Sequence, residues 1–217
     1  FKERKLALSI IKQLFTALDY LHTTAGVKHA DIKGGNILVK INQKNLPHLK
    51  LIDFGFARPI GEKYRRKGTL RYMAPEVINS HSSDEKADIW SACVTIVSMF
   101  GPVYPVEDGK VSDFMTRLGN LNDAEKASWR EIGLDDKVKL LLIECYSADA
   151  KSFKETKECT NAKKTAEQLL VRKMIINHPP DPTFVPGYLS EPLKRCFIHD
   201  PQIRPSAKEM LELFNKL

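Results

Sequence analysis

The sequence predicts a single, mainly α-helical domain with one small β-hairpin, and three patterns lead to this prediction. Apolar residues recur every three or four positions over 5–25, two short apolar runs flank the turn-prone stretch NQKN, and a long apolar segment covers 84–100. With 217 residues, of which 42% are hydrophobic and 28% charged, the chain can bury one substantial core.

The first expected element is an amphipathic helix over residues 5–25. Its apolar stripe is formed by Ile10, Leu14, Leu18 and Leu21. Gly26 follows where a helix commonly ends in a left-handed residue.

Two short strands are expected next, at 37–41 and 49–52, joined by a turn at 42–45. Residues 53–75 show no sustained periodicity and contain three glycines, so we expect a long loop there. Loops of that length are usually functional or disordered, and the motifs at the two ends of this one favour function.

The segment 84–100 is expected to form a helix that is buried on all sides. Ser82 and Glu85 have the spacing of a capping box. Apolar residues then surround nearly the whole circumference: Ile89, Trp90, Val94, Ile96, Val97 and Met99.

The remainder is less regular until the C-terminus. Helical patterns occur near 123–132, 135–147 and 161–177. Two further helices are expected at 189–199 and 206–217, the second with Ser206 and Glu209 as a capping box.

The composition excludes several classes of protein. Cys93, Cys145, Cys159 and Cys196 are widely scattered, which predicts neither a disulfide framework nor a zinc site and favours a reducing, cytoplasmic setting. The apolar run at 87–100 is too short to cross a bilayer, so no membrane partner is expected. The chain starts at Phe1 without a targeting pattern, so we expect a fragment that further sequence precedes.

The net charge of +7 is partly local. Six basic residues between Arg58 and Arg71 face only Glu62. This run could attract phosphate or an acidic peptide, or it could be a solvated basic loop. A nucleic-acid partner is not expected, because interleaved aromatic residues and a recognisable binding module are lacking.

The stretch KHADIKGGNIL, residues 28–38, concentrates polar residues between apolar ones. Asp31 offers a carboxylate that could orient a hydroxyl group, and Lys33 could neutralise a phosphate. Asn36 and Asp53 offer oxygen ligands for a hard cation such as magnesium. In phosphoryl transfer the protein mainly places the nucleophile and balances charge on the transferred group, and this set of residues supplies both functions.

In this order the motifs resemble those of the protein-kinase family. The stretch 28–36 looks like the catalytic loop, and 53–76 resembles an activation segment from DFG to GTLRYMAPE. The DIW at 88–90 resembles the start of the buried central helix, here 84–100, and HDPQIRPS at 199–206 resembles a late turn of the same fold. Residues 1–217 thus resemble the larger, C-terminal lobe, with a divergent or inserted region at 102–187.

The resemblance implies a role for each polar residue. Asp31 would accept or orient the proton of the substrate hydroxyl, and Lys33 would contact the transferred phosphate of ATP. Asn36 and Asp53 would hold Mg²⁺ ions that bridge the phosphates. Thr69 would hydrogen-bond near Asp31 and Lys33. The lysine two positions after the aspartate, together with GTLRYMAPE, implies a serine/threonine kinase that acts on a protein substrate.

The resemblance also implies structural roles. His29 and Phe54 would pack together, and Asp88 would anchor the backbone of the catalytic loop. Glu76 and Arg204 would form a buried ion pair.

Two alternatives share parts of the pattern. Small-molecule phosphotransferases use a similar aspartate, asparagine and aspartate, but GTLRYMAPE and HDPQIRPS favour protein kinases. A pseudokinase or binding scaffold would typically have lost Asp31, Asn36 or Asp53, and all three are present.

The nucleotide site is expected to be incomplete in this chain. No G-x-G-x-x-G motif occurs, and no VAIK strand precedes the catalytic loop, so we expect the smaller, N-terminal lobe to be missing and the chain alone to be inactive.

Ala30 departs from the arginine that is usual in the family before the catalytic aspartate. That arginine pairs with a phosphorylated residue of the activation segment. Between Gly55 and Gly68 the only hydroxyl side chain is that of Tyr64. We therefore expect a kinase that activation-loop phosphorylation does not switch.

Overall fold

The structure, a computed structural model, describes residues 2–62, 68–80, 84–101, 157–177, 180, 182 and 185–217. The chain divides into two units, residues 1–103 with 178–217, and residues 104–177. The second unit is described only through helix α8 (Lys157–Asn177), which confirms the helix expected at 161–177. The patterns at 123–132 and 135–147 lie outside the described residues.

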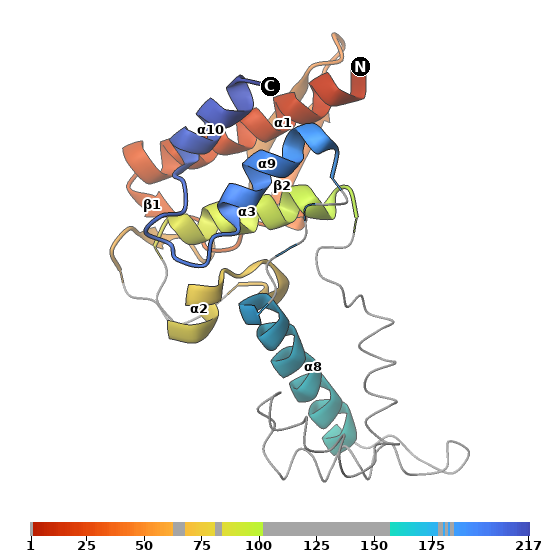
Figure 1. The fold of residues 1–217 in the computed structure, drawn as a ribbon, viewed down its shortest axis with the longest axis vertical. Coiled ribbons are helices and arrows are strands. Elements are labelled where there is room, and N and C mark those ends of the chain that lie inside the picture. The colour runs from red at the N-terminus through yellow and green to blue at the C-terminus, as the bar shows by residue number, and fades with distance from the viewer. Residues whose placement is uncertain are drawn as a thin grey trace, which may run out of the picture. The chain divides into compact units, whose positions relative to one another are not determined.

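The first unit is mainly helical and carries two very small sheets, as the sequence predicts for its fold class (Figure 1). Its elements are α1 (Lys2–Asp19), β1 (Val27–Lys28), β2 (Ile37–Ile41), β3 (Pro47–Leu51), β4 (Arg58–Pro59), α2 (Pro75–Ser80), α3 (Lys86–Ser98), α9 (Gly187–Cys196) and α10 (Ala207–Asn215).

Helix α1 is the predicted amphipathic helix. Its apolar side is buried, and α10 lies alongside it (Figure 1), where the rings of Phe15 and Phe214 stack with centroids 5.4 Å apart. A π-helical turn, Tyr20–Thr24, continues α1. Gly26 then has a φ of +67°, which confirms the expected left-handed residue after the helix.

Helix α3 is the predicted buried helix and forms the centre of this unit. Trp90 and Cys93 are completely buried. Asp88 is only 2% exposed, although it carries a carboxylate. The details at both ends differ from expectation. The helix begins at Lys86 with Glu85 as its N-cap, so Glu85 is not the third residue of a capping box, and Ser82 is outside the described residues. Met99, the residue that follows the last turn of α3, is 52% exposed, so the helix is not buried on all sides at this end.

The β2–β3 hairpin confirms the predicted strands and turn. The strands pair antiparallel from Ile37 with Leu51 to Ile41 with Pro47. In the turn, the Asn42 side-chain oxygen accepts hydrogen bonds from the N–H groups of Lys44 and Leu46, and Asn45 has a φ of +56°.

The loop expected at 53–75 contains regular structure that the sequence does not indicate. Strand β4 pairs antiparallel with β1, so that Lys28 lies opposite Arg58. A 3₁₀ turn, Leu70–Tyr72, precedes α2. Two-residue strands carry too few side chains to show a periodicity, which is why this pairing was missed.

The prediction of no disulfide is wrong. Cys93 of α3 and Cys196 of α9 are joined, although 103 positions separate them. Both cysteines face the core where α9 packs against α3, and spacing along the chain does not reveal such a meeting.

The C-terminal helices agree with the prediction to within a few residues. Helix α9 covers most of the expected 189–199, and α10 follows the predicted capping box. The Ser206 hydroxyl accepts from the Glu209 N–H, and the Glu209 carboxylate accepts from the Ser206 N–H. Among the helices that the structure describes, none is long and apolar enough to cross a membrane.

Candidate active site

The catalytic-loop candidate is attached to α3 through Asp88. One carboxylate oxygen of Asp88 accepts a hydrogen bond from the His29 N–H at 2.7 Å, and the other accepts from the Ala30 N–H at 2.9 Å. His22 lies 3.0 Å from the same carboxylate. Ala30 has a φ of +64°, a conformation that an L-residue adopts at a cost. The two hydrogen bonds hold this backbone in place, as expected for Asp88.

Asp31 lies at the centre of a hydrogen-bonded cluster. One of its carboxylate oxygens accepts from both the N–H and the hydroxyl of Thr69, each at 3.0 Å, and the other accepts from the Lys33 ammonium at 2.7 Å. The same ammonium donates to the Thr69 hydroxyl oxygen at 2.9 Å. The structure thus brings together three predicted residues from two segments of the chain.

The surroundings of Asp31 favour its charged form. Burial by itself would raise its pKa, but hydrogen bonds from Lys33 and Thr69 and the Lys33 charge outweigh burial and lower the pKa below its ordinary value. At neutral pH the group is therefore a carboxylate that can accept a proton or hold a hydroxyl group.

Asn36 is fixed by the same carboxylate. Its side-chain N–H₂ donates to the Asp31 carbonyl at 2.8 Å and to the Asp31 carboxylate at 3.1 Å. These bonds leave the side-chain oxygen of Asn36 as the group able to bind a cation.

Asp53 follows β3 beside Asn36. The Ile52 N–H donates to the Asn36 carbonyl at 3.0 Å, which places the two chain segments next to each other. Asp53 has a φ of +61°, and one of its carboxylate oxygens accepts from the Gly55 N–H at 3.3 Å. One carboxylate and one amide oxygen on adjacent segments are hard ligands of the kind that magnesium prefers, so the donor set fits this ion. Within the described part of the chain, no cluster of three or more His, Cys, Asp or Glu side chains offers another metal site.

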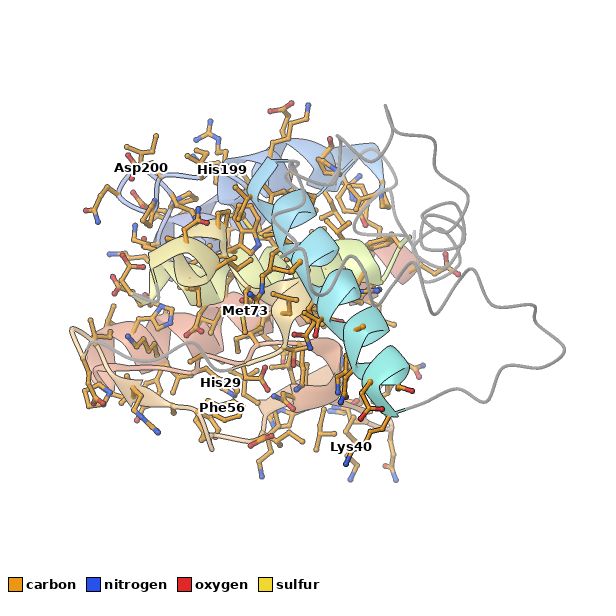
Figure 2. The ribbon with its side chains drawn as sticks, turned by 90° about the horizontal axis from the view of Figure 1, so that it is seen from below. His29, Lys40, Phe56, Met73, His199 and Asp200 are labelled. Atoms are coloured by element: carbon orange, nitrogen blue, oxygen red, sulfur yellow. A yellow bond between two sulfur atoms is a disulfide. The ribbon has the colours of Figure 1, made fainter. Side chains whose placement is uncertain are left out.

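His29, which Figure 2 labels, has the expected packing role. Its ring lies 4.8 Å from that of Phe54 between centroids, and its Nε2 lies 3.0 Å from the Ile52 carbonyl oxygen. His29 therefore connects the catalytic loop to the DFG segment. The Asp31 N–H also donates to Nδ1 of the His29 ring at 3.3 Å.

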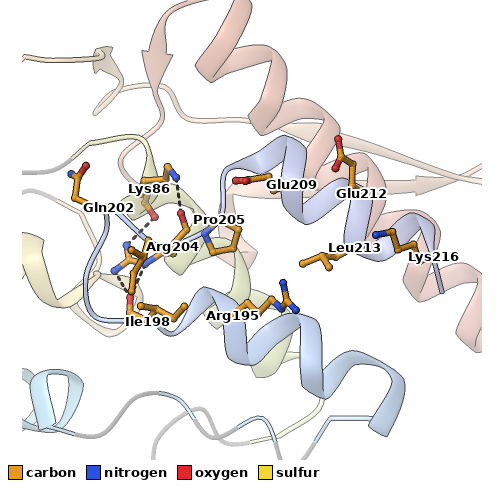
Figure 3. Close-up of a pocket in the computed structure, with 11 residues that line it drawn as sticks. Lys86, Arg195, Ile198, Gln202, Arg204, Pro205, Glu209, Glu212, Leu213 and Lys216 are labelled. Carbon is orange, nitrogen blue, oxygen red and sulfur yellow. Dashed lines mark hydrogen bonds between the residues drawn. The ribbon is translucent and has the colours of Figure 1, made fainter.

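The Glu76–Arg204 ion pair is also confirmed. Two parallel hydrogen bonds of 2.7 and 2.9 Å join the guanidinium to the carboxylate, and the Arg204 side chain is completely buried. Figure 3 shows Arg204 beside Lys86, whose ammonium donates to the Arg204 carbonyl oxygen at 2.6 Å. The cavity drawn there, of about 520 Å³, shares no residue with the Asp31 cluster.

Three residues of this region were not identified from the sequence. His22, in the π-helical turn, contacts Asp88. Lys28 is only 1% exposed, whereas lysine side chains are mostly exposed. A Cβ atom at Gly68 would lie 2.9 Å from the Ala30 carbonyl oxygen, so only glycine fits this approach. Gly68 was visible within the GTLRYMAPE motif, whereas no sequence pattern indicates the roles of His22 and Lys28.

Comparison with known proteins agrees with this geometry. A family model described as "Protein kinase domain" matches residues 1–213. The chain is 37% identical over 131 residues to serine/threonine-protein kinase dkf-2 of Caenorhabditis briggsae, covering 57% of this chain and 10% of that protein. It is 41% identical over 101 residues to serine/threonine-protein kinase ULK3 of Homo sapiens, covering 45% of this chain and 21% of that protein.

A yeast relative gives a similar result. Serine/threonine-protein kinase STE11 of Saccharomyces cerevisiae is 30% identical over 134 residues, which cover 58% of this chain and 18% of that protein. The chain thus matches only a small part of each of these curated relatives. Because the family model extends over nearly all of it, the chain belongs to the protein kinase family.

Proposed function

We propose that this chain is the larger lobe of a serine/threonine protein kinase that transfers the γ-phosphate of ATP to a protein hydroxyl group. The observation on which this proposal depends is the hydrogen-bonded cluster of Asp31, Lys33 and Thr69. It places a charged carboxylate and an ammonium group side by side, which are the groups needed to orient a hydroxyl and to balance phosphate charge.

Each residue of the cluster has a proposed role. Asp31 accepts or orients the proton of the attacking hydroxyl, and Lys33 contacts the transferred phosphate. Thr69 fixes both side chains through its hydroxyl group. A group that is already held in position loses less entropy when the substrate binds, so such preorganisation favours catalysis.

Asn36 and Asp53 are the proposed magnesium ligands. Magnesium would neutralise charge on the ATP phosphates when bound. The two hydrogen bonds to Asp31 fix the orientation of the Asn36 side-chain amide, so the amide oxygen is already positioned to bind a cation.

Two observations support serine/threonine specificity. Lys33 stands two positions after Asp31 and contacts Thr69, as the resemblance to that class implies. The relatives described above are named serine/threonine-protein kinases.

We also propose that a smaller lobe completes the nucleotide site. The 217 residues contain no G-x-G-x-x-G motif. Leu38 is 53% and Phe54 46% exposed, and exposed large apolar side chains can mark a surface that another unit covers. The chain taken alone is therefore proposed to be inactive.

The alternative is a pseudokinase or kinase-like binding scaffold. The presence of Asp31, Asn36 and Asp53 in a connected arrangement favours catalysis instead. Because alanine replaces the usual arginine at position 30, we also propose that activation-loop phosphorylation does not switch this kinase. Tyr64, the one hydroxyl side chain between Gly55 and Gly68, lies outside the residues that the structure describes.

The proposal is tested by phosphate transfer from radiolabelled ATP. The complete gene product is incubated with Mg-ATP and peptides that contain serine, threonine or tyrosine, beside the 217-residue chain. We expect magnesium-dependent label on serine and threonine from the complete protein and none from the chain alone. Label only on tyrosine would contradict the specificity, and no label from the complete protein would favour the scaffold.

A further inference from the structure

The activation segment is attached to the catalytic loop on both sides of residues 63–67. On the later side, the Thr69 N–H donates to the Asp31 carboxylate at 3.0 Å. On the earlier side, β4 pairs with β1, and the Ile60 N–H donates to the Gly26 carbonyl at 3.0 Å. The later attachment is made to Asp31 of the catalytic loop. The earlier one is made to Gly26 and β1, which lead into that loop.

Lys28 adds a side-chain contact to the earlier attachment. It is 1% exposed, and its ammonium donates a hydrogen bond to the Glu62 carbonyl oxygen at 3.0 Å. Glu62 ends a turn in which its own N–H donates to the Pro59 carbonyl at 3.3 Å and Gly61 has a φ of +86°. Lys28 therefore holds the last described residue of the segment before position 63.

A buried lysine at this position calls for an explanation. Burying an ammonium group is unfavourable unless acceptors surround it, so an apolar residue would be the ordinary choice for a buried strand. The ammonium provides what an apolar side chain cannot, a charge-assisted hydrogen bond to a main-chain carbonyl 34 positions away.

We propose that Lys28 is a positioning residue that keeps the start of the activation segment on the catalytic loop without a phosphate group. The inference rests on the proposed function and deepens its regulation. Ala30 has no side chain that could bind a phosphorylated residue. The Lys28 contact requires no modification, because its acceptor is a backbone carbonyl that is always present.

Hydrogen exchange of backbone amides tests the attachment directly. The complete gene product is treated with phosphatase, and exchange at Ile60 and Glu62 is compared in the wild type and in Lys28→Met, a substitution of similar size that removes the donor. We expect both amides to be protected in the wild type and to exchange about tenfold faster or more in Lys28→Met, because the substitution removes a hydrogen bond from a charged group. Lys40→Met, at an exposed lysine of β2, should leave them unchanged.

Kinetics separate positioning from loss of stability. In Lys28→Met we expect the KM for the protein substrate to rise several-fold while the KM for ATP stays the same, because Thr69 of the same segment contacts Asp31, the residue proposed to hold the substrate hydroxyl. Simple destabilisation would instead lower kcat in proportion to the unfolded fraction and leave both KM values unchanged.

Two outcomes would overturn the inference. One is that the Ile60 and Glu62 amides are unprotected in the phosphatase-treated wild type. The other is that these amides exchange equally fast in the wild type and in Lys28→Met. If Lys28→Met does not fold, Lys28→Gln, with a shorter donor, provides the same comparison. Exchange needs no catalysis, so an inactive wild type would count against the proposed function and not against the attachment.

Discussion

The substitution Asp88→Asn tests how the catalytic loop is held. The two oxygens of Asp88 accept separate hydrogen bonds from the N–H groups of His29 and Ala30, and the residue is 2% exposed. Asparagine keeps the size of the side chain and only one acceptor oxygen. One of the two N–H groups would then face an amide N–H₂ group in the interior.

The expected cost follows from these contacts. A hydrogen bond to a charged group contributes roughly 1.5–3 kcal/mol, and a buried donor without an acceptor costs roughly 1–3 kcal/mol. We therefore expect Asp88→Asn to lower the free energy of unfolding by about 3–5 kcal/mol, a large part of the roughly 5–15 kcal/mol typical of a domain. The left-handed Ala30 backbone, which these bonds stabilise, should be released first.

Urea unfolding monitored by circular dichroism measures the loss. Asp84→Asn is the matched control, because the Asp84 carboxylate accepts from the Lys86 N–H at the start of the same helix and the side-chain oxygen of asparagine can accept the same hydrogen bond. It should change stability by less than about 0.5 kcal/mol. Hydrogen exchange at His29 and Ala30 reports local opening. A loss below about 1 kcal/mol with unchanged exchange would refute the anchoring role.

Two further predictions concern charged groups. Glu76→Gln should lower the free energy of unfolding by about 3 kcal/mol or more, since it leaves the completely buried Arg204 without its counter-charge, and urea unfolding that shows no loss would contradict this. The pKa of Asp31 in the folded state lies below the ordinary 3.8. Ionised Asp31 therefore stabilises the folded state above pH 3.8, and this contribution is lost as the pH falls through the lowered pKa. The wild type should therefore lose stability relative to Asp31→Asn as the pH falls below about 5, and most of the loss should occur below pH 3.8. A constant difference in unfolding free energy over this acid range would refute the lowered pKa.

Long helices and contiguous motifs were predictable from the sequence, because each is determined by neighbouring residues. The stripe of α1 and the capping box of α10 depend on contacts three or four positions apart. The positions of Asp31, Lys33 and Thr69 relative to one another followed from the motif resemblance and not from periodicity.

Features that depend on the tertiary fold were not predictable. The Cys93–Cys196 disulfide and the β1–β4 pairing join residues that are far apart in sequence. The burial of Lys28 also opposes the general tendency of lysine to be exposed. Such exceptions are informative, because a buried charge needs a specific partner. For Lys28 that partner is the Glu62 carbonyl oxygen, on which the proposed positioning role depends.

The central claim is that Asp31 serves phosphoryl transfer, and steady-state kinetics of Asp31→Asn in the complete gene product test it most directly. Asp200→Asn is the control, because Asp200 is exposed and its side-chain contact to the Gln202 N–H can be made by asparagine. The account predicts a kcat about 10²-fold or more lower in Asp31→Asn, with unchanged Mg-ATP affinity and with Asp200→Asn at the wild-type level. A kcat for Asp31→Asn equal to that of the control would contradict it.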